Sequence, residues 1–420
     1  MRRLRFGLVL GVGSTLLLAA CGGGGTSNQS FDPTTVSGTV RLSGWTSSPS
    51  EDKLLTDQVA AFQQAYPKIK VTYEPVAQDF RTKLKAQLAS GTEPDVFYLE
   101  LGDAAGLMPK HVLLDLRQYM AKTNTNASDF AGPLLSAFKQ GDAIYGIPKD
   151  FNTLALFYNK DMFSAAGISE PTASWTWQDL ADAAKKLTKG GVYGLMTPPD
   201  SARWAPFVYQ NGGQILSSDN SKSMLTGSAV IEATKYYASF QQNGSGTYPA
   251  KLGAGIGWAG DAFAKGKSAM VMEGGWLIPF MKDYPNVHWN AVELPKGKSQ
   301  GNLFFTVAYA ASARTKNADA SWLLINYLTS LQNQKTVLNS GFALPTRLAL
   351  KDDPFFAAHP ASAAIFAGNA YAKPFAWGVH SDAVSTAISN ALERILLGKQ
   401  TVEQAMAQAD KEVNDAISGG

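Results

Sequence analysis

The sequence predicts an α/β protein of two domains, in which mainly parallel β-sheets are covered by helices. Stretches that alternate apolar and polar residues, as β-strands do, take turns with stretches whose apolar residues recur every three or four positions, as in helices. This alternation favours a parallel sheet with helices on both faces. The chain of roughly 400 residues that a removed leader would leave exceeds the size at which one hydrophobic core keeps growing, so two domains are expected.

The first 20 residues have the features of a secretory signal. Three arginines among the first five residues precede an uncharged, leucine-rich run at 6–20, and small residues stand before the expected cut. This run is shorter than the about 20 residues that a membrane-spanning helix needs. Residues 18–21 read Leu-Ala-Ala-Cys and resemble the lipobox of bacterial lipoproteins, which implies cleavage before Cys21 and attachment of lipid to its sulfur.

The residues after the expected cut have the composition of a tether. Cys21 is the only cysteine and so has no disulfide partner within the chain. Residues 21–38 are rich in Gly, Ser and Thr, which is typical of a flexible linker. We therefore expect a protein of the cell envelope, held by an N-terminal lipid at the outer face of the cytoplasmic membrane, in the extracellular or periplasmic space.

The charge of the chain argues against nucleic acid as a partner. The sequence has 37 Lys and Arg against 34 Asp and Glu, and cleavage before Cys21 would leave 34 of each. A nucleic-acid-binding domain would instead show a basic excess or a basic patch. No later segment is apolar over the length of a transmembrane helix.

A β-α-β-α-β pattern opens the first domain. We expect its strands and helices, in chain order, at 39–45, 51–66, 69–73, 80–91 and 94–98. Apolar residues recur at helical spacing in both helices. Pro67 ends the first helix and Gly91 closes the second.

Strands and helices continue through the rest of the chain. We expect strands at 154–158 and 268–272, and helices at 176–188, 228–242, 381–397 and 402–417. Thr176 and Asp179, three residues apart, form a variant of the capping box at the start of one helix. The segment 307–331 predicts a strand end and then a helix whose apolar stripe places Trp322 in the core.

Five segments resemble one known family in the same order along the chain. They are FQQAYPKIKV at 62–71, LKAQLASGTEPDV at 84–96, YGIPKDFNTLALFYNKD at 145–161, FAKGKSAMVMEGGW at 263–276 and GFALPTR at 341–347. The chain resembles the bacterial extracellular solute-binding protein family 1, the sugar-binding components of ABC importers that include maltose-binding protein.

The resemblance implies a two-lobe periplasmic-binding-protein fold with three crossing segments at the hinge. It divides the chain into an N-terminal lobe of 39–149 and 306–343 and a C-terminal lobe of 150–305 and 344–420. It also implies a monomer that closes around a ligand in the interlobe cleft and then docks on ABC permease subunits. No cofactor or metal is expected.

Sugars need flat aromatic faces against their rings and fixed polar groups for their hydroxyls. Ligands of α/β sheets bind at the carboxyl ends of strands, which selects Trp45, Tyr98 and Glu100. The resemblance adds candidates at the crossings and in the second lobe. The full set of expected ligand contacts is Trp45, Tyr98, Glu100, Asp150, Phe151, Arg203, Trp204, Gly275, Trp276, Phe305, Arg347 and Trp377. Each aromatic could instead serve the core, and each charged residue could pair with a surface group.

These candidates favour a sugar or oligosaccharide as the ligand, bound without catalysis. Arg203 and Arg347 leave room for an acidic sugar. One alternative is the same fold with a polyamine, a glycerol phosphate ester or a peptide. A more distant alternative is a secreted glycoside hydrolase that uses Glu100 and Asp150 as its two carboxylates.

Overall fold

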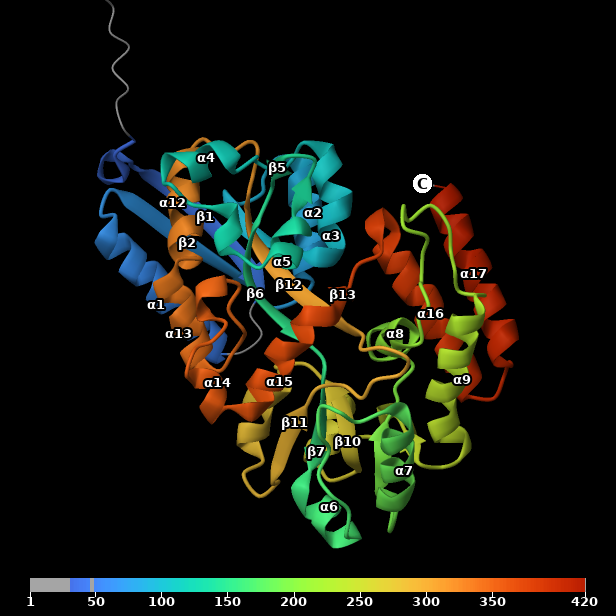
Figure 1. Ribbon diagram of the computed structural model, residues 1–420. Coiled ribbons are helices and arrows are strands. Elements are labelled where there is room, and N and C mark those ends of the chain that lie inside the picture. The colour runs from blue at the N-terminus through green and yellow to red at the C-terminus, as the bar shows by residue number, and fades with distance from the viewer. Residues whose placement is uncertain (1–30, 46–48, 420) are drawn as a thin grey trace, which may run out of the picture.

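The computed structural model describes residues 31–45 and 49–419 of the 420-residue chain. The expected signal peptide and Cys21 lie outside the described residues. Two β-sheets, each packed with helices, form two lobes that are joined by β-strands and loops (Figure 1). The two-lobe α/β fold expected from the sequence is confirmed.

The first lobe is built on a sheet with the strand order β13-β12-β3-β1-β2. A further strand, β6, pairs with β12 along the edge opposite to β3. Both β2 and β3 run parallel to β1, and α1 and α2 connect them, as predicted. The elements of this lobe are β1 (Gly38–Trp45), α1 (Pro49–Ala65), β2 (Ile69–Val76), α2 (Phe80–Ser90), β3 (Val96–Glu100), α3 (Leu101–Leu107), α4 (Arg117–Lys122), α5 (Gly132–Ser136), β4 (Lys139–Gln140), β5 (Ala143–Ile144), β6 (Ile147–Thr153), β12 (Asn302–Ala311), α12 (Ala318–Leu328) and α13 (Leu331–Ser340). The short strand β13 (Ala372–Pro374) joins this sheet only at the start of β12, Asn302–Phe304, which lies next to the second lobe.

The second lobe is built on a sheet with the strand order β11-β7-β10-β8-β9. Its elements are β7 (Ala155–Asn159), α6 (Lys160–Ala166), α7 (Trp177–Leu187), β8 (Tyr193–Met196), α8 (Ser201–Gln210), α9 (Ser228–Gln242), β9 (Gly246–Thr247), α10 (Ala259–Ala264), β10 (Ser268–Glu273), α11 (Leu277–Phe280), β11 (Trp289–Val292), α14 (Phe355–Ala358), α15 (Pro360–Gly368), α16 (Ser381–Leu396) and α17 (Val402–Ser418).

Both sheets contain antiparallel strand pairs beside the parallel ones that the sequence predicts. In the second sheet, β7 is antiparallel to β10 and to β11, while β8 is parallel to β10 and to β9. β7 follows β6 after Leu154 alone and so enters its sheet directly from the hinge.

Local sequence signals set the ends of several helices. Thr176 and Asp179 form a reciprocal capping box at the start of α7, as predicted. Gly91 ends α2 in the left-handed region, with φ of 74°. Gly194 in β8 is required for a different reason, the close packing of α7 against the strand. A β-carbon at this position would stand 2.0 Å from the carbonyl oxygen of Ala184.

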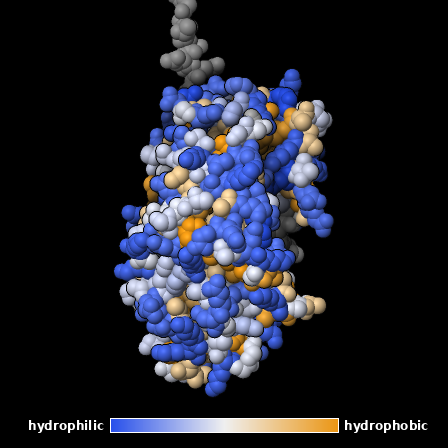
Figure 2. All heavy atoms as spheres, turned by 90° about the vertical axis from the view of Figure 1, so that its right-hand side faces the viewer, coloured by the Kyte–Doolittle hydropathy of each residue, from blue (hydrophilic) through white to orange (hydrophobic). Residues whose placement is uncertain are grey.

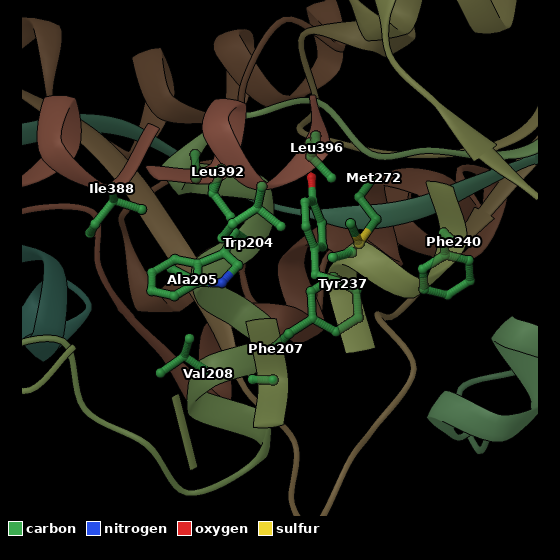
Figure 3. Close-up of a cluster of buried hydrophobic side chains, with 14 of the residues drawn as sticks. Trp204, Ala205, Phe207, Val208, Tyr237, Phe240, Met272, Ile388, Leu392 and Leu396 are labelled. Carbon is green, nitrogen blue, oxygen red and sulfur yellow. The ribbon is translucent and has the colours of Figure 1, made fainter. Parts of the chain in front are cut away.

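Each lobe has its own hydrophobic core. Phe62 and Trp322 are fully buried in the first, and Trp322 occupies the core position expected for it. In the second, Trp204 and Tyr237 pack with Ile388 and Leu392 of α16 (Figure 3). Full burial of each such side chain contributes about 1.5–3 kcal/mol, so the helices α16 and α17 are integral to this lobe.

Three segments carry the chain between the lobes. Two of them are β6 and β12, which run antiparallel along most of their length. The third is the loop after α13, in which Leu344 forms a β-bridge with Phe151 of β6. Side chains fasten these segments to one another: Thr306 Oγ1 donates to the carbonyl of Asp150 (2.6 Å), and the Gln334 amide joins the carbonyl of Lys149 to the N–H of Thr346.

The surface shows no continuous apolar face on the side that carries the C-terminal helices, where hydrophobic residues are scattered among hydrophilic ones (Figure 2). Within residues 31–45 and 49–419, no helix is both long and apolar enough to cross a membrane. The described chain begins on the first lobe, where Phe31 and Val36 pack against the core.

The contact between α7 and β8 yields a test of this packing. Gly194→Ala should destabilise the protein by about 1–3 kcal/mol, because the new methyl group overlaps the backbone of α7. Gly106→Ala in α3 is the control: apart from its chain neighbours and the backbone of its own helix, no atom lies within 4 Å of the added carbon, and its stability should stay unchanged or rise by up to about 1 kcal/mol. Denaturant unfolding measures both. Equal stability of the two variants would contradict the close packing at Gly194.

Candidate functional site

A cavity of about 900 Å³ lies between the two lobes. Its position at a domain interface and its size, near the top of the about 300–1,000 Å³ usual for small-molecule sites, mark it as the candidate site. The first lobe contributes Trp45, Arg81 and Glu100, and the second contributes Trp276, Phe280 and Asp382. The crossing segments form its floor with Lys149, Asp150 and Phe305.

Five of the expected ligand contacts line this cavity. They are Trp45 at the end of β1, Glu100 at the end of β3, Asp150 in β6, Trp276 after β10 and Phe305 in β12. They come from separate parts of the sequence, and the fold brings them together around one space. Their contact with a ligand stays a prediction.

Three expected contacts are buried away from the cavity. Tyr98 is 2% exposed and lies beneath Trp45, with ring centroids 5.0 Å apart. Phe151 faces the core at the crossing, against Phe366. Trp204 has no exposed surface, and its Nε1–H donates to Thr234 Oγ1 (3.0 Å). The expectation that these side chains face the cleft is therefore corrected: β3, β6 and α8 turn Tyr98, Phe151 and Trp204 inward.

Two expected arginine contacts are engaged elsewhere. The Arg203 guanidinium is ion-paired with the carboxylates of Glu273 and Asp200. Arg347 lies over the ring of Phe130, 4.0 Å from its centroid, and donates to the carbonyl of Thr329. Neither lines the cavity, because buried partners hold both guanidinium groups.

The last two expected contacts lie just behind the cavity wall. Gly275 donates its N–H to Asn152 Oδ1 (3.1 Å), and a β-carbon there would stand 2.3 Å from that oxygen. Trp377 is 5% exposed and packs edge-on against Phe375, which does line the cavity. Each therefore supports a residue that the cavity exposes.

Aromatic rings stand on both sides of the cavity. On the first lobe, Trp45 is held edge-on by Tyr98 and by Phe80. Opposite it, Trp276 is edge-on to Phe305 at 5.4 Å, and Phe305 in turn contacts Phe375 at 5.1 Å. Packing of this kind leaves few alternative orientations to an aromatic ring, so both indoles offer fixed surfaces.

The floor carries a buried charge cluster. The Lys149 ammonium is ion-paired with Asp150 and lies 3.7 Å from Glu51; each of the three side chains is 12% exposed or less. Burial opposes the charge of Lys149, but the Asp150 carboxylate, with Tyr309 and Glu51, raises its pKa above the usual range. Lys149 is therefore cationic at neutral pH.

A second charge cluster joins the lobes at the rim. Arg81 of α2 contacts Glu100 at 3.0 Å and Asp103 at 2.6 Å in its own lobe, and Asp382 of α16 at 3.1 Å in the other. Lys85 reaches both Asp103 and Asp382. Burial raises the pKa of Glu100, and the Arg81 charge opposes this rise. The cluster places a polar boundary around the cavity.

Several residues that line the cavity are not among the ligand contacts expected from the sequence. Phe342 and Phe375 line the cavity. Phe342 lies within the GFALPTR segment, and Phe375 stands two residues before Trp377. Arg81 and Asp382 are 301 positions apart in the chain, so only the fold could show their contact. Among the described residues, no group of three or more His, Cys, Asp or Glu is placed to hold a metal ion.

Comparison with known proteins places this arrangement in context. The model of a family described as bacterial extracellular solute-binding protein matches residues 57–364. The galactooligosaccharide-binding protein of Bacillus subtilis is 26% identical, in an alignment that covers 96% of this chain and 94% of that protein.

Solved structures show the same fold. An ABC substrate-binding protein from Listeria monocytogenes, in complex with cycloalternan, superposes with a TM-score of 0.83 at 26% identity over 90% of this chain and 99% of the other. The GacH receptor of Streptomyces glaucescens, solved unliganded and with acarbose, gives 0.80 at 24% identity over 91% and 99% of the two chains; this match shows the fold alone.

The floor cluster yields a test of its energetics. Lys149→Met removes the cation that faces Asp150 and Glu51, and should destabilise the protein by about 3–5 kcal/mol. Because the pKa of Lys149 is raised, its contribution is complete below the usual lysine pKa and is lost only as the pH rises through the higher value of the folded protein.

Denaturant unfolding at neutral pH measures the loss. The control is Lys53→Met, since Lys53 is 75% exposed and pairs with its exposed helical neighbour Asp57; its stability should change by no more than about 0.5 kcal/mol. A comparable loss in both variants would show that the buried cluster contributes nothing specific.

Proposed function

The chain belongs to the bacterial extracellular solute-binding protein family, and from that premise we propose that it captures an oligosaccharide in the interlobe cavity and delivers it to an ABC importer. The family resemblance seen in the sequence is confirmed by the match over residues 57–364. A member of this family works outside the cytoplasm. The relative that binds galactooligosaccharides and the neighbour that holds cycloalternan support a sugar as the ligand.

The single observation that carries the proposal is one indole from each lobe in the lining of a single cavity that acidic side chains line as well. Trp45 stands on the first lobe and Trp276 on the second, and Glu100 and Asp150 line the same space. A sugar ring has apolar C–H faces and a hydroxyl edge. Indole rings suit the faces, and carboxylates accept charge-assisted hydrogen bonds from the hydroxyls. A cavity of about 900 Å³ favours several sugar units over one.

The charges of the cavity favour a neutral ligand over an acidic one. Of the described residues that line it, five are carboxylates and three are basic. Arg81 already faces three carboxylates and Lys149 two. Arg203 and Arg347, which could have matched an acidic sugar, are paired elsewhere. An anionic ligand would therefore meet an excess of like charge without a free guanidinium partner.

Capture needs only a change in the balance between open and closed forms. A ligand that contacts both lobes binds the closed form better and so shifts the equilibrium towards it. The hydrolase alternative is less well supported, because Glu100 and Asp150 are each held by a basic side chain. We propose binding without a chemical step, by a monomer that uses no cofactor.

A thermal-shift screen tests the sugar assignment. Residues 22–420 are heated with monosaccharides, galacto- and maltooligosaccharides, sugar phosphates and polyamines. An oligosaccharide at 100 times its Kd should stabilise the protein by about 2.7 kcal/mol. Trp276→Ala should abolish that shift, because it removes one wall of the cavity.

Two controls make the screen decisive. Trp175→Ala removes an indole of the same lobe that packs on Phe163 outside the cavity, and should keep the response to sugar. The wild-type incubation should release no reducing ends, whereas their release would favour the hydrolase. A response to phosphates or polyamines alone would replace the sugar with that class of ligand.

We also propose that the chain is anchored through lipid on Cys21, as the Leu-Ala-Ala-Cys segment at 18–21 indicates. Several acyl chains on one cysteine would hold the protein firmly to the membrane. Cys21→Ser should move the protein from the membrane fraction to the soluble fraction of cells that express it, and Ser27→Ala, in the linker that follows Cys21, should not. Retention of the Cys21 variant in the membrane fraction would exclude this anchor.

A further inference from the structure

Glu273 is a buried carboxylate that lies behind the cavity wall. It is the last residue of β10, is 1% exposed, and stands three residues before Trp276. Burial of an ionised carboxylate is costly unless its partners compensate fully. Its position at the carboxyl end of a central strand brings it next to the indole that lines the cavity.

The bonds of Glu273 connect Arg203 to Trp276. Its Oε2 accepts a hydrogen bond from Trp276 Nε1 at 2.8 Å and another from the Arg203 guanidinium. In the described part of the chain, Glu273 Oε1 and Arg203 Nε have no hydrogen-bond partner, although both atoms are buried. Burial raises the pKa of Glu273, and the charge of Arg203 does not fully reverse this rise. A buried ion pair with unsatisfied atoms contributes little to the stability of the fold, so stability alone does not explain this pair.

The same contacts restrict the Trp276 indole from every side but one. Its N–H end is held by Glu273, its edge meets Phe305, and the Arg203 guanidinium carbon lies 5.7 Å from the ring centroid. Beneath it, a β-carbon on Gly274 would stand 2.3 Å from the ring, so only glycine leaves room for the indole there. The remaining surface faces the cavity.

We propose that Glu273 is a positioning residue, which fixes the orientation of the Trp276 indole for ligand binding, and that Arg203 acts through Glu273 by holding the carboxylate ionised and in place. The role in binding rests on the proposed function, since it requires that Trp276 meet the sugar. Supporting groups of this kind raise affinity because the contact surface needs no ordering when the ligand arrives.

A double substitution separates positioning from stability. Glu273→Leu with Arg203→Met replaces the ion pair by apolar side chains, a change that is often neutral or stabilising. The matched control is Glu93→Leu with Arg314→Met, since Glu93 is also buried, also pairs with an arginine and also has one oxygen without a partner in the described structure. It does not line the cavity.

The first measurement is the indole ¹H–¹⁵N signal of Trp276 in the ligand-free chain, assigned through Trp276→Phe. We expect this signal to shift in the Glu273 double variant and to stay in place in the Glu93 double variant. An unchanged signal in the Glu273 variant would overturn the proposal. Because no sugar is needed, this result is independent of the proposed function.

The second measurement is the Kd for maltotriose and for galactotriose. We expect it to rise by roughly two- to tenfold in the Glu273 variant, as the cost of ordering one freed side chain predicts, and to remain unchanged in the Glu93 variant. A moved indole signal with an unchanged Kd would overturn the role in binding. If the double variant does not fold, Glu273→Gln, which keeps the shape of the side chain, is measured in the same two ways. Wild-type protein that binds neither sugar would count against the proposed function and not against the orientation of the indole.

Discussion

The pairing of β6 with β12 is the constraint on which the rest of the structure depends. These two strands run antiparallel through the centre of the molecule, and each end of the pair leads into one of the lobes. Thr306 and Gln334 tie the three crossing segments together at the level of Lys149 and Asp150. The floor of the cavity is thus part of the hinge, so a ligand that rests on it contacts the element about which the lobes move.

Sequence patterns predicted the parts of the fold that depend on local order. The β-α-β-α-β start, the capping box at Thr176 and the αL end at Gly91 follow from side chains close in sequence. Strand ends and the family resemblance together led to Trp45, Glu100 and Trp276. The antiparallel pairs of β7 and β12 were not predicted, because strand direction depends on how the chain crosses the hinge, which local patterns do not encode.

The misplaced candidates share one physical cause. Tryptophan suits both a sugar site and a core, so residue type cannot separate Trp276 from Trp204, which is fully buried. Arginine is equally ambiguous, because its role depends on which carboxylate it meets. The partner of Arg203 lies 70 positions away, and that of Arg81 across the rim lies 301 away. Only the tertiary structure could show these pairs.

The start of the described chain has a mechanical consequence. Phe31 and Val36 are packed into the first lobe, whereas the last helix, α17, belongs to the second. Any force that acts on the N-terminal end is therefore applied directly to the first lobe. The second lobe receives that force only as far as the crossing segments transmit it, because neither of its helices α16 and α17 contacts the described N-terminal residues.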